Sequence, residues 1–334
     1  MANLTRREFF KRSLASTIAG GIILSGAEAF AREAAGTVVQ PVGSVIDLSR
    51  CDGCKDVKVP RCVQACRDKN QNRFPEPVKD ILDYWPQKKH EDWSKKRHLT
   101  DRLTPYNWTF VQEVQVEHNG RKEKIYIPRR CMHCDNPPCA KLCPFSAQQK
   151  TPEGPVLINP NICFGGAKCR TVCPWHIPQR QAGVGLYLKV APKFAGGGVM
   201  YKCDLCYDRL LAGKLPACAE ACPNEAITFG PKEEMRKLAH QRAKELDGFI
   251  YGEKENGGTS TFYVSSVPFQ KIHQAIMQTK SKAKKQQPGI PGMPVGVENY
   301  LETPNGMAWG FVVAPLAGAF AAGYAAYRTM KGGE

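Results

Sequence analysis

The usual sequence signals of a redox enzyme are missing from this chain. Its 334 residues contain no Cys-x-x-Cys-His sequence, the attachment site of a c-type haem. They also contain no Gly-x-Gly-x-x-Gly loop, which binds the pyrophosphate of a dinucleotide, and no second metal motif beside the cysteines described next. These absences argue against a self-contained haem or nucleotide-dependent enzyme.

Cysteine, in contrast, is abundant, and its fifteen copies fall into four groups that each end in Cys-x-x-x-Cys. An odd number of cysteines, arranged largely in Cys-x-x-Cys pairs, argues against a disulfide scaffold. The groups are Cys51, Cys54, Cys62 and Cys66; Cys131, Cys134, Cys139 and Cys143; Cys163, Cys169 and Cys173; and Cys203, Cys206, Cys218 and Cys222.

The spacing within these groups is typical of ligands to iron–sulfur clusters. A Cys-x-x-Cys turn brings two thiolates to one cluster, the next cysteine supplies a third, and the final cysteine reaches the neighbouring cluster. Proline follows the final cysteine in three groups, at Pro144, Pro174 and Pro223. A structural zinc site with four thiolates is the alternative, although zinc ribbons do not ordinarily repeat Cys-x-x-x-Cys-Pro.

The third group lacks one ligand. Gly166 stands where the bacterial Cys-x2-Cys-x2-Cys-x3-Cys pattern has its second cysteine, and glycine offers no side chain to a metal. The sequence therefore predicts a three-iron cluster, 3Fe-4S, held by Cys163, Cys169 and the crossing Cys143. A 4Fe-4S cluster with water or a distant side chain on its fourth iron remains the alternative.

The basic character of the chain fits such clusters better than it fits nucleic acid. Lys and Arg number 47 against 31 Asp and Glu, giving a formal charge of +16, of which residues 1–31 contribute four basic and two acidic groups. Each oxidised cluster with its thiolates adds roughly two negative charges, which would bring the rest of the chain to about +6. We expect no nucleic-acid partner.

The N-terminus carries the features of a twin-arginine export signal. Arg6 and Arg7 precede an apolar run from Leu14 to Ala27 and small residues suited to cleavage near Ala31. A chance Arg pair before a short buried helix is the alternative. Export by this route carries folded proteins, which suits a protein whose clusters are assembled in the cytoplasm.

The C-terminus carries a candidate membrane anchor. Residues 307–327 contain no charged residue, and a helix of that length spans about 30 Å. Arg328 and Lys331 follow, which predicts a cytoplasmic C-terminus and a main domain on the periplasmic face of the membrane. A buried core helix is the alternative. Small residues recur every four positions, at Gly310, Ala314, Gly318 and Ala322, which would allow a second membrane helix to approach.

The fold class predicted is α+β, with two pseudo-symmetric ferredoxin-like modules, insertions and one transmembrane helix. Residues 154–159 are predicted to form a turn that leads into a short strand, and residues 226–230 are predicted to stand in the same relation to the Cys-Pro of group four. This repetition of a cysteine turn, a short helix, Cys-Pro and a strand is the ferredoxin pattern. We also expect a helix over 231–246 and a strand over 261–267. The expected parts are the signal (1–31), module one (45–75 and 200–272), an insertion (76–124), module two (125–199), a tether (273–306) and the anchor (307–327).

These residues resemble the four-cluster ferredoxin-type subunits of membrane-bound respiratory oxidoreductases. The likeness is greatest to the iron–sulfur subunit of periplasmic hydrogenase-2 and next to the formate dehydrogenase beta subunit. It rests on segments such as 130–134, 201–206, 213–218 and 251–255. The resemblance implies crosswise nesting of the cysteines, with one cluster held by Cys51, Cys54, Cys62 and Cys222, a second by Cys66, Cys203, Cys206 and Cys218, and a third by Cys131, Cys134, Cys139 and Cys173.

The function predicted is that of a non-catalytic relay with three 4Fe-4S clusters and one 3Fe-4S cluster. Its expected partners are an exported catalytic subunit, with a [NiFe] hydrogenase as the favoured identity, and a quinone-reactive membrane subunit. A molybdopterin oxidoreductase such as formate dehydrogenase is the alternative partner. Two other hypotheses are a self-contained iron–sulfur oxidoreductase and a free soluble electron carrier, and the second conflicts with the predicted anchor.

Overall fold

A computed structural model describes residues 40–313 except residues 79, 85–86, 191–196 and 283–287, and after residue 313 it describes only positions 316, 319, 323 and 327. The predicted export signal therefore lies outside the described residues, as does most of the predicted anchor.

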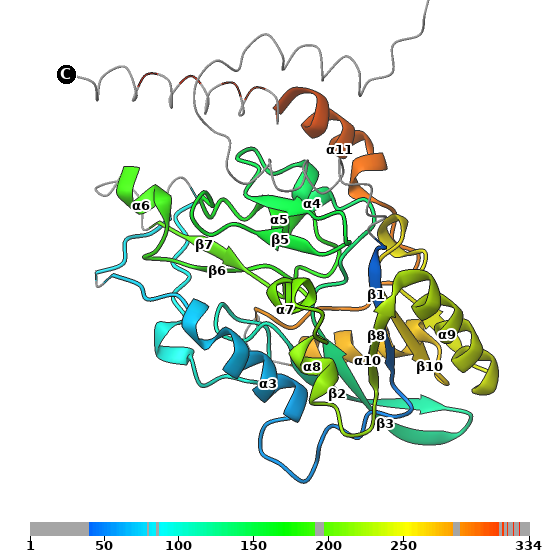
Figure 1. Cartoon of the computed structure of the whole chain (residues 1–334). Helices are drawn as coiled ribbons and strands as arrows, with labels where there is room; N and C mark the ends of the chain where they lie inside the picture. Colours follow the sequence, from blue (N-terminus) through cyan, green and yellow to red (C-terminus); the bar gives the residue numbers. More distant parts are fainter. Residues whose placement is uncertain are drawn as a thin grey trace, which may run out of the picture. The chain divides into compact units, whose positions relative to one another are not determined.

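The largest sheet joins a strand that precedes all the cysteine groups to strands that follow the last one (Figure 1). Its strand order is β8-β1-β10-β9, in which β1 pairs antiparallel with β8 and parallel with β10. The central β1 is buried on both faces, and one face packs against α9 through Val45, Met235 and Phe262. The elements are β1 (Val42–Asp47), β8 (Ile227–Pro231), α9 (Lys232–Glu245), β9 (Phe249–Tyr251) and β10 (Thr261–Ser265). The predicted helix over 231–246 and strand over 261–267 are confirmed to within one or two residues.

Two small hairpins connect the middle cysteine groups. The strand after group two pairs with the strand before group three, and the strand after group three pairs with the strand before group four. These hairpins are β4 (Gln148–Lys150) with β5 (Val156–Ile158), and β6 (Gln179–Gln181) with β7 (Val199–Tyr201). The short helices beside them are α4 (Pro138–Lys141), α5 (Lys168–Thr171), α6 (Leu186–Val190), α7 (Tyr207–Leu211) and α8 (Ala217–Glu220).

The predicted repeat is visible in the backbone after each Cys-Pro. The third residue beyond the final cysteine adopts a left-handed conformation in all three cases, with φ of 49° at Ser146, 51° at His176 and 48° at Glu225. Its N–H donates to the carbonyl of that cysteine at 2.9–3.2 Å, as from His176 to Cys173. Group one lacks the proline, and there α3 (Arg61–Asn70) continues past Cys66.

The segment before group two is folded against the core. A long hairpin pairs β2 (Phe110–His118) with β3 (Arg121–Arg129), and its turn at Asn119 and Gly120 has positive φ at both residues. Alternate side chains of the hairpin are buried and pack against α10 (Phe269–Lys282). Trp93 and Trp108 are also buried, whereas Trp85 lies outside the described residues. Short 3₁₀ turns at Gln71–Arg73 and Ser94–Lys96 complete this region.

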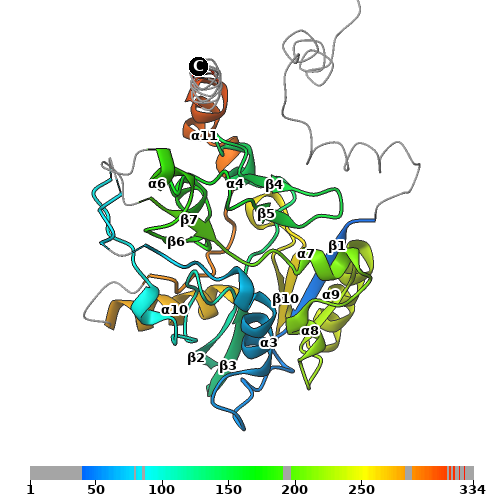
Figure 2. The same ribbon diagram turned by 60° about the vertical axis from the view of Figure 1, so that its left-hand side comes forward.

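The segment expected as a tether differs from a free linker. Its first part belongs to α10, and Met293 and Asn299 are fully buried. Arg129 donates to the carbonyl of Gly292 at 2.5 Å, and the Asn299 amide donates to carbonyls of Asn136 and Asn256 at 2.8 and 3.0 Å. Backbone and polar contacts can hold a Pro- and Gly-rich segment on the core despite its composition. It leads to a 3₁₀ turn (Tyr300–Glu302), α11 (Pro304–Ala308) and a π-helical turn (Trp309–Val313), at the upper end of the ribbon in Figure 2.

Within the described part of the chain, we find no helix with the length and apolar character needed to cross a membrane.

The packing of residue 293 can be tested by a pair of methionine variants. Met293→Ala removes a fully buried side chain and is expected to lower the free energy of unfolding by about 2–5 kcal/mol. Met277→Ala removes a side chain on α10 that is 45% exposed, so its effect is expected to stay within about 0.5 kcal/mol. Thermal denaturation followed by circular dichroism measures both. Equal midpoints for the two variants would contradict the packed arrangement.

Candidate metal centres

All fifteen cysteines are described, and all are free thiols. The sequence groups do not stay separate in space, because thiols distant in sequence lie next to one another. A cavity lined by Cys51, Cys54, Cys62 and Cys222 joins group one to the last cysteine of group four. Burial raises the pKa of Cys51 to about 11, and the neighbouring thiols of Cys222 and Cys54 add to this rise.

The second set lies beside the first, across α3 and α8. Burial raises the pKa of Cys66 well above its ordinary value, and the next largest causes are the thiols of Cys203, Cys218 and Cys206. Asn70 anchors the end of α3 by donating to the Cys66 carbonyl at 2.8 Å, and its amide lies 3.6 Å from the Cys66 sulfur.

The third set combines group two with the last cysteine of group three. Burial is the main cause that raises the pKa of Cys139 well above its ordinary value. The neighbouring thiols of Cys134, Cys173 and Cys131 raise it further. Side-chain amides already point at these sulfurs. Gln148 donates to Cys139 at 2.9 Å, and Asn256 donates to Cys134 at 3.2 Å.

The fourth set contains three cysteines. Burial raises the pKa of Cys169, and the thiols of Cys163 and Cys143 are the next causes. Backbone N–H groups of Met200 and Gly165 lower the pKa of Cys163 against the larger effect of burial. The structure thus places close together the thiols of each set that the resemblance implies, and the three thiols of the set that lacks a fourth, whereas their assignment as cluster ligands stays a prediction.

The donor chemistry of these sets fits iron–sulfur clusters. Buried thiols that crowd one another resist ionisation, so thiolate ligation needs a bound cation nearby. The third residue of each group has positive φ, at 76° for Gly53, 50° for His133, 70° for Gly165 and 58° for Leu205. Successive N–H groups in such turns point into a concavity that binds anions, and the Leu205 N–H lies 3.3 Å from the Cys203 sulfur.

Two of these turns require glycine for space as well as for conformation. A Cβ at Gly53 would lie 2.4 Å from the Tyr126 ring, and a Cβ at Gly165 would lie 2.5 Å from the carbonyl oxygen of Gly198. No side chain fits at either distance without a shift of the neighbour.

Two buried cations lie between the second and third sets. Lys202 is 6% exposed and donates to the Cys203 carbonyl at 3.1 Å and to the Val156 carbonyl. Arg130 is 2% exposed and donates to Ser44. Although burial opposes its charge, the pKa of Lys202 is raised by Cys131, Cys139 and Cys203 together. These cations would offset the negative charge of thiolate-ligated clusters.

Sequence reasoning missed both cations, although a signal was present. A basic residue directly precedes the first cysteine of three groups, at Arg50, Arg130 and Lys202. Arg50 is exposed and pairs with Glu225 at 3.4 Å. A basic residue before the first cysteine therefore does not by itself indicate whether the cation is buried.

Of the aromatic and histidine residues beside the cysteines, two are buried and hydrogen-bond to other parts of the protein. Trp175 is buried and donates to the Tyr251 hydroxyl at 2.6 Å. His133 is fully buried and accepts from the Val156 N–H at 2.9 Å, and its pKa is lowered well below the ordinary value by burial and by Lys202. It is therefore a neutral packing residue, whereas His176 is exposed at the surface.

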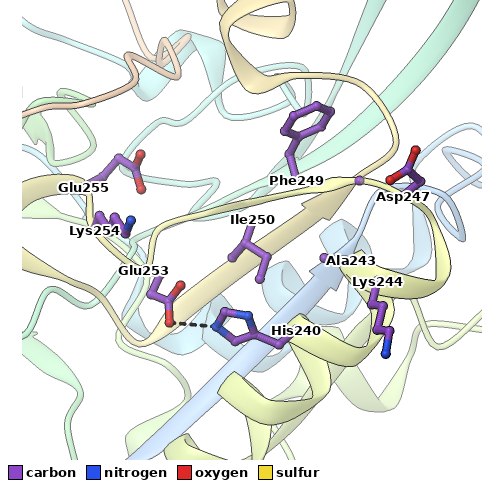
Figure 3. Close-up of a pocket in the computed structure, with 10 residues that line it drawn as sticks. His240, Ala243, Lys244, Asp247, Phe249, Ile250, Glu253, Lys254 and Glu255 are labelled. Carbon is purple, nitrogen blue, oxygen red and sulfur yellow. Dashed lines mark hydrogen bonds and ion pairs between the residues drawn. The ribbon is translucent and has the colours of Figure 1, made fainter.

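A surface pocket away from the thiols lies between α9 and β9 (Figure 3). His240 points across it to Glu253, with 3.0 Å between Nε2 and the carboxylate. Its lining contains no cysteine. With His240 paired to Glu253 and no thiol in the lining, the cysteine sets remain the candidate site.

Comparison with known proteins agrees with this chemistry. The family described as the 4Fe-4S dicluster domain matches residues 50–147, and a second family of the same description matches residues 122–232. The formate dehydrogenase, nitrate-inducible, iron-sulfur subunit of Escherichia coli is 32% identical over 230 residues, 67% of this chain and 67% of that protein. The chain belongs to the 4Fe-4S dicluster family of iron–sulfur electron-transfer subunits.

Two other relatives extend the match. The hydrogenase-2 operon protein HybA of Shigella flexneri is 29% identical over 307 residues, 80% of this chain and 83% of that protein. A protein of Nitratidesulfovibrio vulgaris is 33% identical over 231 residues, and this chain spans 55% of its length. The predicted family, the ferredoxin-like modules and the iron–sulfur electron-transfer function are confirmed, and the number and type of clusters stay predictions. Among the described residues, no group of three or more His, Cys, Asp or Glu is arranged to hold a single metal ion.

An ion-pair network next to the three-cysteine set gives a testable pH dependence. Burial alone would raise the pKa of Glu91, but Arg170 and Arg180 outweigh it and hold the pKa below its ordinary value of 4.5. Glu91 contacts these guanidinium groups at 2.7 and 3.1 Å. A depressed carboxyl pKa stabilises the fold above pH 4.5, and this stabilisation is lost as pH falls through the folded-state pKa.

Glu91→Gln is accordingly expected to destabilise the protein by about 3 kcal/mol at neutral pH, because Arg180 is left buried without its carboxylate. The difference from the unchanged protein should shrink as pH falls below 4.5. Glu76→Gln is the control, since its pair with Arg97 is largely exposed and solvent screening leaves it little effect on stability. Thermal unfolding across this pH range measures all three, and a pH-independent difference would count against the ion pair.

Proposed function

We propose that this chain relays single electrons between an exported catalytic subunit and a quinone-reactive membrane subunit. The fifteen cysteines would hold three 4Fe-4S clusters and one 3Fe-4S cluster, the latter at Cys143, Cys163 and Cys169. Each cluster, when bound, supplies a one-electron carrier whose potential depends on charge, hydrogen bonds and burial. Module one would comprise residues 45–75 and 200–272, and module two residues 125–199, with 76–124 inserted between them.

The linear adjacency of the cysteine sets carries this proposal. Cys62 and Cys66 lie one helical turn apart on α3, so they link the first set to the second. Cys131 adds to the raised pKa of the buried Cys203, which links the third set to the second. Cys169 lies within α5 and Cys173 follows the end of that helix, so the two link the fourth set to the third. A line of four adjacent sites suits conduction through the chain rather than chemistry at one centre.

The three-cysteine set lies at the end of this line that is next to the start of the predicted anchor. The Lys168 ammonium on α5 lies 3.5 Å from the centre of the Trp309 ring, and it lies 5.5 Å from that of Tyr300. Large apolar side chains of the following stretch are exposed, at Met307, Trp309, Val312, Leu316 and Tyr327. This exposure supports a membrane anchor over 307–327, with its C-terminus in the cytoplasm and the main domain in the periplasm after twin-arginine export through residues 1–31.

The names of the relatives support two candidate partners. HybA is named as a hydrogenase-2 operon protein, which favours a [NiFe] hydrogenase as the catalytic subunit. The second relative is named as a formate dehydrogenase subunit, which makes a molybdopterin oxidoreductase the second candidate.

Purification from detergent-solubilised membranes distinguishes these partners. We expect the full chain to co-purify with a catalytic subunit and an integral membrane subunit, identified by mass spectrometry. Truncation after residue 306 is expected to abolish recovery of the membrane subunit, because the segment with exposed apolar side chains is removed. A full chain that purifies alone and turns over a small-molecule substrate would overturn the relay.

The cluster type of the fourth set is tested by restoring its ligand. A Cβ at residue 166 has ordinary van der Waals space, so Gly166→Cys is tolerated sterically and supplies the missing thiolate. We expect the oxidised protein to show a three-iron electron paramagnetic resonance signal that Gly166→Cys abolishes, with one more iron per chain. Absence of that signal from the unchanged protein would refute the three-iron assignment.

A further inference from the structure

We propose that Tyr84 borders the position of the missing ligand in group three and, in the absence of a thiolate there, keeps water from holding a fourth iron at that site. The inference rests on the three-iron cluster proposed above and assigns a role to the 76–124 insertion, which supplies this side chain.

The space beside Gly166 is where the argument begins. A Cβ built on Gly166 would lie 3.6 Å from the Tyr84 hydroxyl oxygen, the only heavy atom of the described residues recorded within 4 Å of it. Gly166 does not have the positive φ that marks Gly165, so its backbone does not itself demand glycine. The phenol therefore borders the space that a cysteine side chain would enter.

Tyr84 is held firmly in this position. It is 5% exposed, and its hydroxyl donates to the carbonyl of Phe164 at 2.9 Å. The Arg180 guanidinium lies over its ring at 4.3 Å, and the Tyr187 ring meets it edge-on at 5.5 Å. A side chain fixed by a hydrogen bond, a cation and a second ring presents a constant surface to the site.

The same insertion also holds the glycine loop and the neighbouring helix. Gln87 donates to the Gly166 carbonyl at 3.0 Å, and Arg180 donates to the Gly165 carbonyl at 2.9 Å. Glu91 pairs with Arg180 and with Arg170, which is next to Cys169 on α5. The loop that lacks the cysteine is thus fixed by partners whose positions depend on the insertion.

A fourth iron at this corner would need both room and a ligand that is not cysteine. Water or hydroxide could serve, as in the alternative cluster considered for this group, but either requires an open, polar space. A buried phenol ring whose hydroxyl proton is already donated to Phe164 provides neither. The corner therefore does not take a water-ligated iron, whereas a cysteine at residue 166, whose Cβ has ordinary van der Waals space, would supply its own thiolate.

The test is iron uptake by the full chain with its clusters assembled. Dithionite gives one electron to the oxidised three-iron cluster, and the reduced cluster can then bind one Fe²⁺ to form a 4Fe-4S cluster of charge 2+. After excess Fe²⁺ is removed and the sample is reoxidised, the unchanged protein is expected to keep its full three-iron resonance. Tyr84→Ala is expected to lose most of it and to gain one iron per chain.

Three variants separate this role from general damage to the fold. Tyr84→Leu opens the same corner with less loss of packing and should also take up iron, which keeps the test valid if the alanine variant fails to fold. Tyr84→Phe keeps the ring and should retain the signal. Tyr106→Ala is the matched control, because Tyr106 is a buried tyrosine of the same insertion that donates to the Pro75 carbonyl at 2.9 Å beneath Arg97, and it should retain the signal.

Two results count against the inference, and they differ. If the unchanged protein shows the three-iron resonance and both Tyr84→Ala and Tyr84→Leu keep it after iron is added, the closing role of Tyr84 is wrong and the cluster assignment stands. If the unchanged protein shows no such resonance, the cluster assignment itself fails, and the role of Tyr84 fails with it.

Discussion

The need to gather buried thiols from distant parts of the chain is the constraint on which the rest of this structure depends. Each four-thiol set takes its last cysteine from another group, so the fold closes only when the ends of the cysteine-bearing region meet. The antiparallel pairing of β1 with β8 makes that closure, because it brings Cys222 next to Cys51. Without bound iron, burial and then the neighbouring thiols raise the pKa of these cysteines and oppose their ionisation, so cluster binding and folding should be coupled.

The electrostatics of the chain follow from this crowding. Buried cations are costly unless negative charge lies close by. Lys202 and Arg130 meet that condition mainly through the cysteines around them, with Asp204 adding to the effect on Lys202. The formal charge of +16 on the whole chain would likewise offset the negative charge of thiolate-ligated clusters. A positive protein frame can hold several anionic clusters without requiring nucleic acid as a partner.

The sequence was sufficient for features that depend on local spacing. The four cysteine groups, the Cys-Pro turns and the glycine in place of a ligand are visible in short windows, since each reflects a turn or one helical step. Contacts between distant residues were not visible, and Tyr84 lies 80 positions from the carbonyl it binds. Composition was also a poor guide near the C-terminus, where a Pro- and Gly-rich segment buries Met293 and Asn299 by hydrogen bonding its backbone to the core.

The short helix α5 connects these parts. A helix of four residues has no stability of its own, so its position depends on its partners. On one side Arg170 pairs with Glu91 of the insertion, and on the other Lys168 lies against Trp309 at the start of the proposed anchor. Between these two residues is Cys169, a ligand of the proposed three-iron cluster. The same four residues would therefore fix the last site of the relay both to the 76–124 insertion and to the segment that leads to the membrane.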